Sequence, residues 1–237
     1  MPDRYETVWL RLNQLRTALL YNGPLSVYGA YTVLGQRRLP GGIKTASRAP
    51  LATLDRHMKI LQELEEVTVY KTEPYKTGQA KKFYGLTLYG FLRSFRIPGA
   101  IALKNFRRVI QIWLQEEKFQ KSFFLPSAEV VEALSDRDAT AHLGRFCQFI
   151  ANMFGDAEDF MDCLEAIGYA RSDPTRVIDL AMRFAIIEYG SRFVLTLKAL
   201  CDHFPSFRTQ VQGFIKRERE SLDVMQNELL GTGAGLP

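Results

Sequence analysis

Apolar residues recur every three or four positions along most of this chain, which is the spacing of one face of an α-helix. In the first third of the chain this spacing predicts helices over residues 6–21, 26–34 and 51–65. The second of these begins at Ser26, a residue type that caps helix N-termini, and it stops at Gly35.

The helix over 51–65 has two faces of different character. Five apolar residues form a stripe that we expect to be buried: Leu51, Leu54, Met58, Leu61 and Leu64. The side chains left toward solvent are Thr53, Arg56, His57 and Lys59. In the helix over 6–21 the same reasoning leaves Arg11, Gln14 and Thr17 on the solvent face. Both helices are therefore predicted to be amphipathic.

The helical spacing gives way to β-type sequence after residue 66. Residues 67–72 and 80–86 are rich in β-branched and aromatic side chains, and the turn-like segment 73–79 separates them. This pattern predicts a β-hairpin. Thr87 then provides a hydroxyl that can cap a helix starting near Leu88.

After Pro98 only helical patterns remain. The predicted helices cover residues 100–119, 127–135, 138–154, 156–168, 174–203 and 206–230. The predicted fold class is therefore mainly α with a small β-hairpin: three helices and the hairpin in a first domain, then an α-helical bundle. We place the domains at residues 1–96 and 97–230, with a flexible tail at 231–237.

Charge divides the 237-residue chain in the same place. Residues 1–96 hold 15 lysines and arginines against 7 aspartates and glutamates, a formal charge of +8, whereas residues 97–237 hold 16 against 19, a charge of −3. A basic segment joined to a mildly acidic one is expected when only one part meets a polyanion. Residues 36–50 add a loop with four basic and no acidic residues.

The order of these elements resembles a known domain. Residues 52–67 are similar to the third helix of prokaryotic winged-helix transcription regulators of the MarR, ArsR and PadR kinds, and residues 25–35 to their second helix. The segment from Thr77 through Leu86-Thr87-Leu-Tyr-Gly90 is similar to their basic wing followed by a Leu-Thr-x-x-Gly cap. The resemblance covers about residues 6–95. It departs from the family at 36–50, where the family has a short turn.

The resemblance implies a non-enzymatic, cytoplasmic DNA-binding transcription regulator without a cofactor, acting as a homodimer on double-stranded DNA. The third helix is expected to enter the major groove, which admits one helix, while wing and loop contact phosphates. The expected DNA-binding residues are Arg48, Thr53, Arg56, His57, Lys59, Lys76, Lys81 and Lys82. For residues 97–230 dimerisation and the binding of a small-molecule or protein effector both stay open.

A second interpretation keeps the fold and makes the first domain a protein-docking module in a larger complex, without sequence-specific DNA binding. Signs of an enzyme are weak, since no GxSxG, HExxH or phosphate-loop pattern occurs. Cys201 and His203 are two residues apart but have no further metal ligand near them in the sequence. The most apolar stretch, 181–200, holds four charged residues, so we expect no membrane span.

Overall fold

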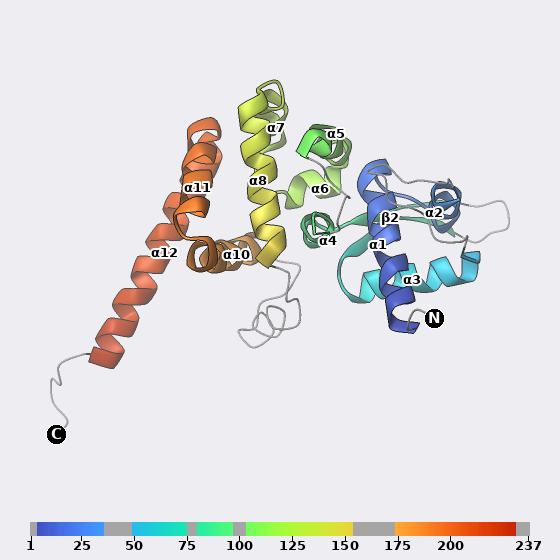
Figure 1. The fold of residues 1–237 in the computed structure, drawn as a ribbon, viewed down its shortest axis with the longest axis horizontal. Coiled ribbons are helices and arrows are strands. Elements are labelled where there is room, and N and C mark those ends of the chain that lie inside the picture. The colour runs from blue at the N-terminus through green and yellow to red at the C-terminus, as the bar shows by residue number, and fades with distance from the viewer. Residues whose placement is uncertain (1–3, 36–48, 75–79, 97–102, 154–173, 231–237) are drawn as a thin grey trace.

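The computed structural model describes residues 4–35, 49–74, 80–96, 103–153 and 174–230 (Figure 1). The helices α1, α2 and α3 and the hairpin lie toward one end of the long axis of the molecule, and α12 lies at the other end. The described chain is mainly helical with one two-stranded antiparallel hairpin, which confirms the predicted fold class.

The first part of the chain forms four helices and the hairpin. Its elements are α1 (Arg4–Asn22), α2 (Val27–Leu34), α3 (Leu51–Glu63), β1 (Val67–Pro74), β2 (Ala80–Leu86) and α4 (Leu88–Ser94). Both predicted caps are confirmed. The Ser26 hydroxyl accepts a hydrogen bond from the Gly29 amide at 3.0 Å, and the Thr87 hydroxyl accepts one from the Gly90 amide at 3.0 Å.

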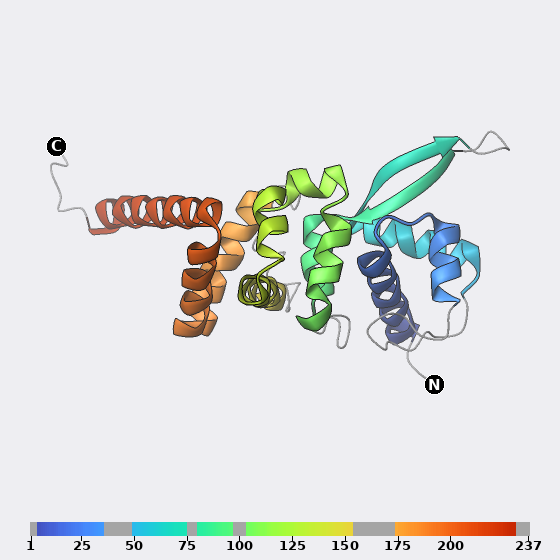
Figure 2. The same cartoon turned by 90° about the horizontal axis from the view of Figure 1, so that it is seen from above.

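The hairpin is tied to the helices at its base and projects beyond them at its tip (Figure 2). Its antiparallel register starts with Val67 opposite Leu86 and is interrupted by a bulge at Tyr70. Leu25, between α1 and α2, exchanges two backbone hydrogen bonds of 2.9 Å with Tyr84 of β2. This bridge fixes the start of α2 against the hairpin.

The second part of the chain is a helical bundle. Its elements are α5 (Leu103–Trp113), α6 (Glu117–Ser122), α7 (Ser127–Ala133), α8 (Arg137–Met153), α10 (Pro174–Tyr189), α11 (Ser191–His203) and α12 (Pro205–Leu230). In the described part of the chain no helix is both long enough and apolar enough to cross a membrane. The predicted helix over 156–168, the tail 231–237 and the loop residues 36–48 lie outside the described residues.

Two long helices predicted in this bundle are each broken in the structure. The helix over 100–119 ends after Trp113, because Glu116 has an extended backbone and α6 starts anew behind it. The helix over 174–203 is interrupted by Gly190, whose φ of +51° lies in the left-handed region that only glycine adopts readily. Apolar spacing continues across both breaks, so periodicity alone did not reveal them.

Burial agrees with the predicted faces of α3 only in part and corrects the predicted solvent face of α1. Leu54, Met58 and Leu61 are buried, whereas Leu51 is 42% exposed because it is the first residue of α3, one turn before the buried stripe begins. Gln14 and Thr17, predicted on the solvent face, are both buried. The reason is that α1 is surrounded by α2, α3, α4, α5 and β2 and has little free face left.

One continuous apolar core runs through both parts of the chain. The Trp113 indole N–H donates to the Leu20 carbonyl at 2.9 Å, and its ring meets the edge of Phe91 at 6.2 Å between centroids. Phe91 also contacts Phe119 of α6 at 4.8 Å. The helices α5 and α6, which follow the predicted domain boundary at residue 96, thus share their core with the elements before it.

Candidate nucleic-acid interface

The outer face of α3 carries three of the predicted contact residues together. Arg56 and Lys59 are exposed, and Thr53 is half-buried beside them. Lys59 forms an ion pair with Asp55 at 3.0 Å, and this hydrogen bond raises the pKa of the Lys59 ammonium. Among the described residues Arg56 has no ion pair, so its guanidinium is available to an external anion.

His57 does not belong to this face. Its side chain is only 5% exposed, and within the described residues its Nδ1 has no hydrogen-bond partner. Burial lowers the pKa of His57 below its ordinary value of 6.5, and the nearby charges of Arg11 and Arg56 lower it further. The prediction that His57 faces solvent is therefore wrong. Its imidazole ring lies on the buried face of α3 and is neutral there.

The hairpin presents its lysines on two faces. Lys71 and Lys81 lie over the ring of Phe83, at 4.4 and 4.8 Å from its centroid, and Lys71 also pairs with Glu73 at 3.0 Å. Lys82 points to the opposite face of the strand and is exposed. The remaining predicted contacts, Arg48 and Lys76, lie outside the described residues.

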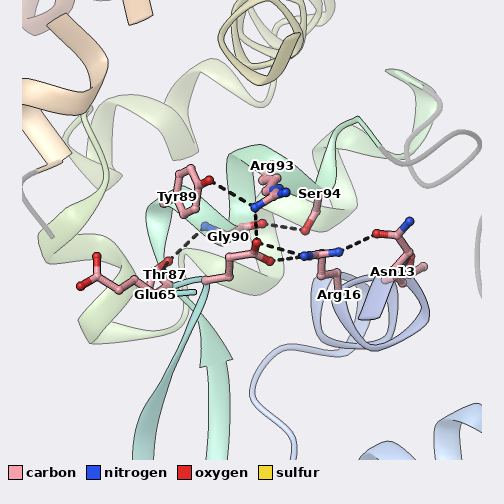
Figure 3. A network of polar contacts seen from close by, with 10 residues as sticks. Asn13, Arg16, Glu65, Thr87, Tyr89, Gly90, Arg93 and Ser94 are labelled. Atoms are coloured by element: carbon pink, nitrogen blue, oxygen red, sulfur yellow. Dashed lines mark hydrogen bonds and ion pairs between the residues drawn. The ribbon is translucent and has the colours of Figure 1, made fainter. Parts of the chain in front are cut away.

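A buried ion cluster holds α3 and the hairpin in place relative to α1 (Figure 3). The carboxylate of Glu66, the residue before β1, pairs with both the Nε and, at 3.0 Å, the Nη2 of Arg16 on α1. Its Oε1 also accepts from Arg93 of α4 at 2.5 Å. Glu66 is 0% exposed and Arg16 1%. A buried carboxylate needs such partners, because desolvation is costly for an unpaired charge.

The backbone around Glu66 is equally constrained. Glu65 has a φ of +55°, and its carbonyl accepts from the Thr87 hydroxyl at 2.7 Å. The Cα of Gly90 lies so close to this turn that a Cβ built there would collide with the Glu66 carbonyl oxygen. Only glycine fits this approach, so the turn from α3 into β1 is locked against the start of α4.

The root of the hairpin is held from the other side by the bundle. Tyr70, at the bulge, donates its hydroxyl hydrogen to the Leu86 carbonyl at 2.7 Å and meets the edge of Trp113 at 5.9 Å. Burial raises the pKa of the Tyr70 hydroxyl, so it stays protonated and can donate. The Lys118 ammonium of α6 donates to the Val69 carbonyl at 2.6 Å.

The polar residues that position the interface were missed by sequence reasoning. Arg16 belongs to an amphipathic helix, and Glu66 is one of three acidic residues between positions 63 and 66, so neither differs in spacing from a solvated charge. The signal that was present is the glycine of the Leu-Thr-x-x-Gly segment, Gly90, whose closeness to Glu66 explains why glycine is needed there. Lys118 had no sequence signal.

The described histidine, cysteine and acidic side chains do not gather into a metal site. No three of them lie close enough together to hold a metal ion. Cys147 is buried and Cys201 is half-buried, and in both cases burial raises the thiol pKa, which makes the reactive thiolate scarce.

Comparisons with protein-family models, with curated proteins and with solved structures find no match to this chain.

Proposed function

We propose that this chain is a DNA-binding transcription regulator in which residues 4–96 act as a winged helix. In this proposal α3 enters the major groove of duplex DNA, and the hairpin lies along the phosphate backbone. The observation that carries the proposal is the pairing of an exposed cationic face on α3 with a projecting hairpin that presents lysines on both faces. The formal charge of +8 over residues 1–96 supports it.

Each element has a distinct task in this proposal. Arg56 and Thr53 reach toward base edges, since they lie on the outer face of α3, and Lys59 contacts a phosphate after its pair with Asp55 opens. Lys81 and Lys82 neutralise phosphates along the hairpin. The buried cluster around Glu66 keeps α3 and hairpin at one fixed angle, so that both reach one duplex together.

The direct test is fluorescence anisotropy of the full chain with a duplex of about 30 base pairs, roughly three helical turns, over a salt series. The double variant Arg56→Glu/Lys82→Glu should bind at least about tenfold more weakly. Its log–log salt slope should be about one unit shallower, because the lost phosphate contact of Lys82 removes about 0.9.

A matched control carries the same change of charge elsewhere. Arg192 and Lys198 are exposed on α11, so Arg192→Glu/Lys198→Glu should leave affinity within about twofold except for weak long-range attraction. Equal affinity of the Arg56→Glu/Lys82→Glu variant and the unchanged protein at moderate salt would refute the proposed surface.

A second candidate function is docking onto an acidic protein partner. It is favoured by Leu51, which is 42% exposed at the start of α3. It is also favoured by Asp55 and Glu73, because these carboxylates already form ion pairs with Lys59 and Lys71. An apolar residue in a cationic rim fits a protein surface better than a phosphate backbone. Absence of duplex binding at low salt, with a partner retained after nuclease treatment, would favour this candidate.

A further inference from the structure

The buried side chain of His57 has a polar atom that nothing in the described chain satisfies. The residue is 5% exposed, and its Nδ1 is one of two buried side-chain nitrogen or oxygen atoms without a hydrogen-bond partner among the described residues. Buried polar atoms are nearly always paired, so an unpaired one needs an explanation. The DNA binding proposed above does not use this atom.

Two guanidinium groups lie close to the His57 imidazole. Arg56 precedes it on α3, and Arg11 lies on α1, which packs against α3 (Figure 1). Arg56 is exposed and Arg11 is half-buried, and among the described residues neither of them forms an ion pair. The positive charges of both arginines act on His57, and both oppose protonation of its ring.

The carboxylates of the surrounding elements do not balance these charges. Asp55 of α3 pairs with Lys59, and Glu73 of β1 pairs with Lys71. Glu66, before β1, is shared by two arginines of the buried ion cluster. The helix α2, which also packs against α3, has no charged residue. In the described chain the place where α1 meets α3 therefore carries positive charge without a counterion.

We propose that Arg11, His57 and Arg56 bind a tetrahedral oxyanion of the phosphate class between α1 and α3. Guanidinium groups hold such anions through paired N–H donors, and an imidazolium ring adds a further donor and a further charge. The ring takes up its proton as the anion binds, because the anion offsets the two positive charges that oppose protonation. This inference goes beyond the DNA binding proposed above, since a free anion fills the site without a duplex.

The test is the pKa of His57 in the full chain, followed by NMR of the imidazole protons with and without sodium sulfate. Sulfate is the probe because it stays doubly negative over the pH range in which histidine titrates. Sodium chloride at the same ionic strength separates binding from screening. The chain has three histidines, so the variant His57→Gln assigns the signal. We expect sulfate to raise the pKa of His57 by about one pH unit, which equals about tenfold tighter sulfate binding to the protonated ring.

The variant Arg11→Gln should lose this response to sulfate. It starts from a higher His57 pKa, because one opposing charge is gone, so the quantity compared is the change that sulfate produces. The matched control Arg107→Gln removes an exposed arginine of α5 and should keep the full response. An equal rise in chloride, or an undiminished response in Arg11→Gln, overturns the proposed site.

A second arm distinguishes a free anion from a phosphate of a nucleic-acid backbone, since both present the same oxygens. A duplex of about 30 base pairs replaces sulfate at low salt. A rise of the His57 pKa in sulfate assigns the site to a free anion, and a rise with the duplex alone assigns it to a backbone phosphate. No rise with either probe overturns the proposal. A sulfate response in a protein that does not bind duplex DNA would retain this site and refute the proposed function.

Discussion

The two regions of the molecule, residues 4–96 and 103–230, differ in which side chains they bury: the first buries more polar side chains, and the second exposes more large apolar ones. Among the described residues, seven of the eight buried polar side chains lie in the first region, and the exception is Thr196. Nine of the thirteen exposed large apolar residues lie in the second. The first region thus fixes its internal geometry with directional contacts, whereas the second leaves more of its large apolar side chains exposed.

The largest effect expected from this difference comes from Glu66. Glu66→Gln removes the charge that Arg16 and Arg93 share and leaves two guanidinium groups without a counterion in or next to the core. Removing one partner of a buried ion pair costs about 3–5 kcal/mol of unfolding free energy. Urea denaturation followed by circular dichroism measures it.

Two controls make the comparison between regions quantitative. Glu63→Gln changes an exposed carboxylate on α3 and should shift the unfolding free energy by less than about 0.5 kcal/mol. Thr196→Val removes a hydroxyl whose hydrogen-bond partner within the described residues is the Arg192 carbonyl of its own helix, and should cost less than about 1 kcal/mol. If Glu66→Gln were as mild as these two, the first region would not depend on its buried polar cluster.

Gly90→Ala is the next largest change. The new Cβ would meet the Glu66 carbonyl oxygen, and relief requires movement of backbone on both sides, with a cost of about 1–3 kcal/mol or more. In the second region Gly213→Ala meets only the end of the Arg217 side chain, at 3.3 Å, and should gain roughly 0.5–1 kcal/mol of helix stability. Opposite signs of the two shifts in melting temperature are the expected outcome, and equal signs contradict it.

A smaller, pH-dependent effect is expected at His57. The folded pKa is lowered, so below the ordinary value of 6.5 the unfolded chain takes up a proton that the folded chain does not. The His57 contribution to stability is therefore complete above pH 6.5 and is lost as the pH falls below it. Melting temperatures of His57→Leu and the unchanged protein, compared at about pH 7.5 and pH 5.5, should show the variant losing less on acidification. Parallel losses would mean that His57 titrates normally.

Local signals in the sequence predicted much of the fold. Ser26 and Thr87 were identified as caps from residue type, because a cap depends only on the residue and its next turn. The break at Gly190 was missed because the apolar spacing continues through it. Spacing also misplaced Leu51, since whether a neighbouring element covers it depends on tertiary contacts.

In the candidate site, too, features set by the local sequence were predicted and features set by tertiary contacts were missed. The outward placement of Arg56 and Lys59 was predicted from their position on the helix opposite the apolar stripe. His57 was misplaced because it lies at the border of that stripe, where its side chain is buried next to that of Met58. The partners of Glu66 lie 50 residues before it and 27 after it, and no local pattern links charges so far apart.

The two tryptophans of the chain provide intrinsic fluorescence at two places near the base of the hairpin, Trp113 beside Tyr70 and Trp9 beside the ion cluster of Glu66. Trp113 is fully buried and touches Tyr70 at the bulge, so its fluorescence should be blue-shifted and sensitive to a twist of the hairpin. Trp9 is 47% exposed and lies 5.6 Å from the guanidinium carbons of both Arg16 and Arg93. With Trp9→Phe in place, the remaining emission comes from Trp113 beside the hairpin bulge, and a change in it on adding duplex DNA would report binding in unlabelled protein.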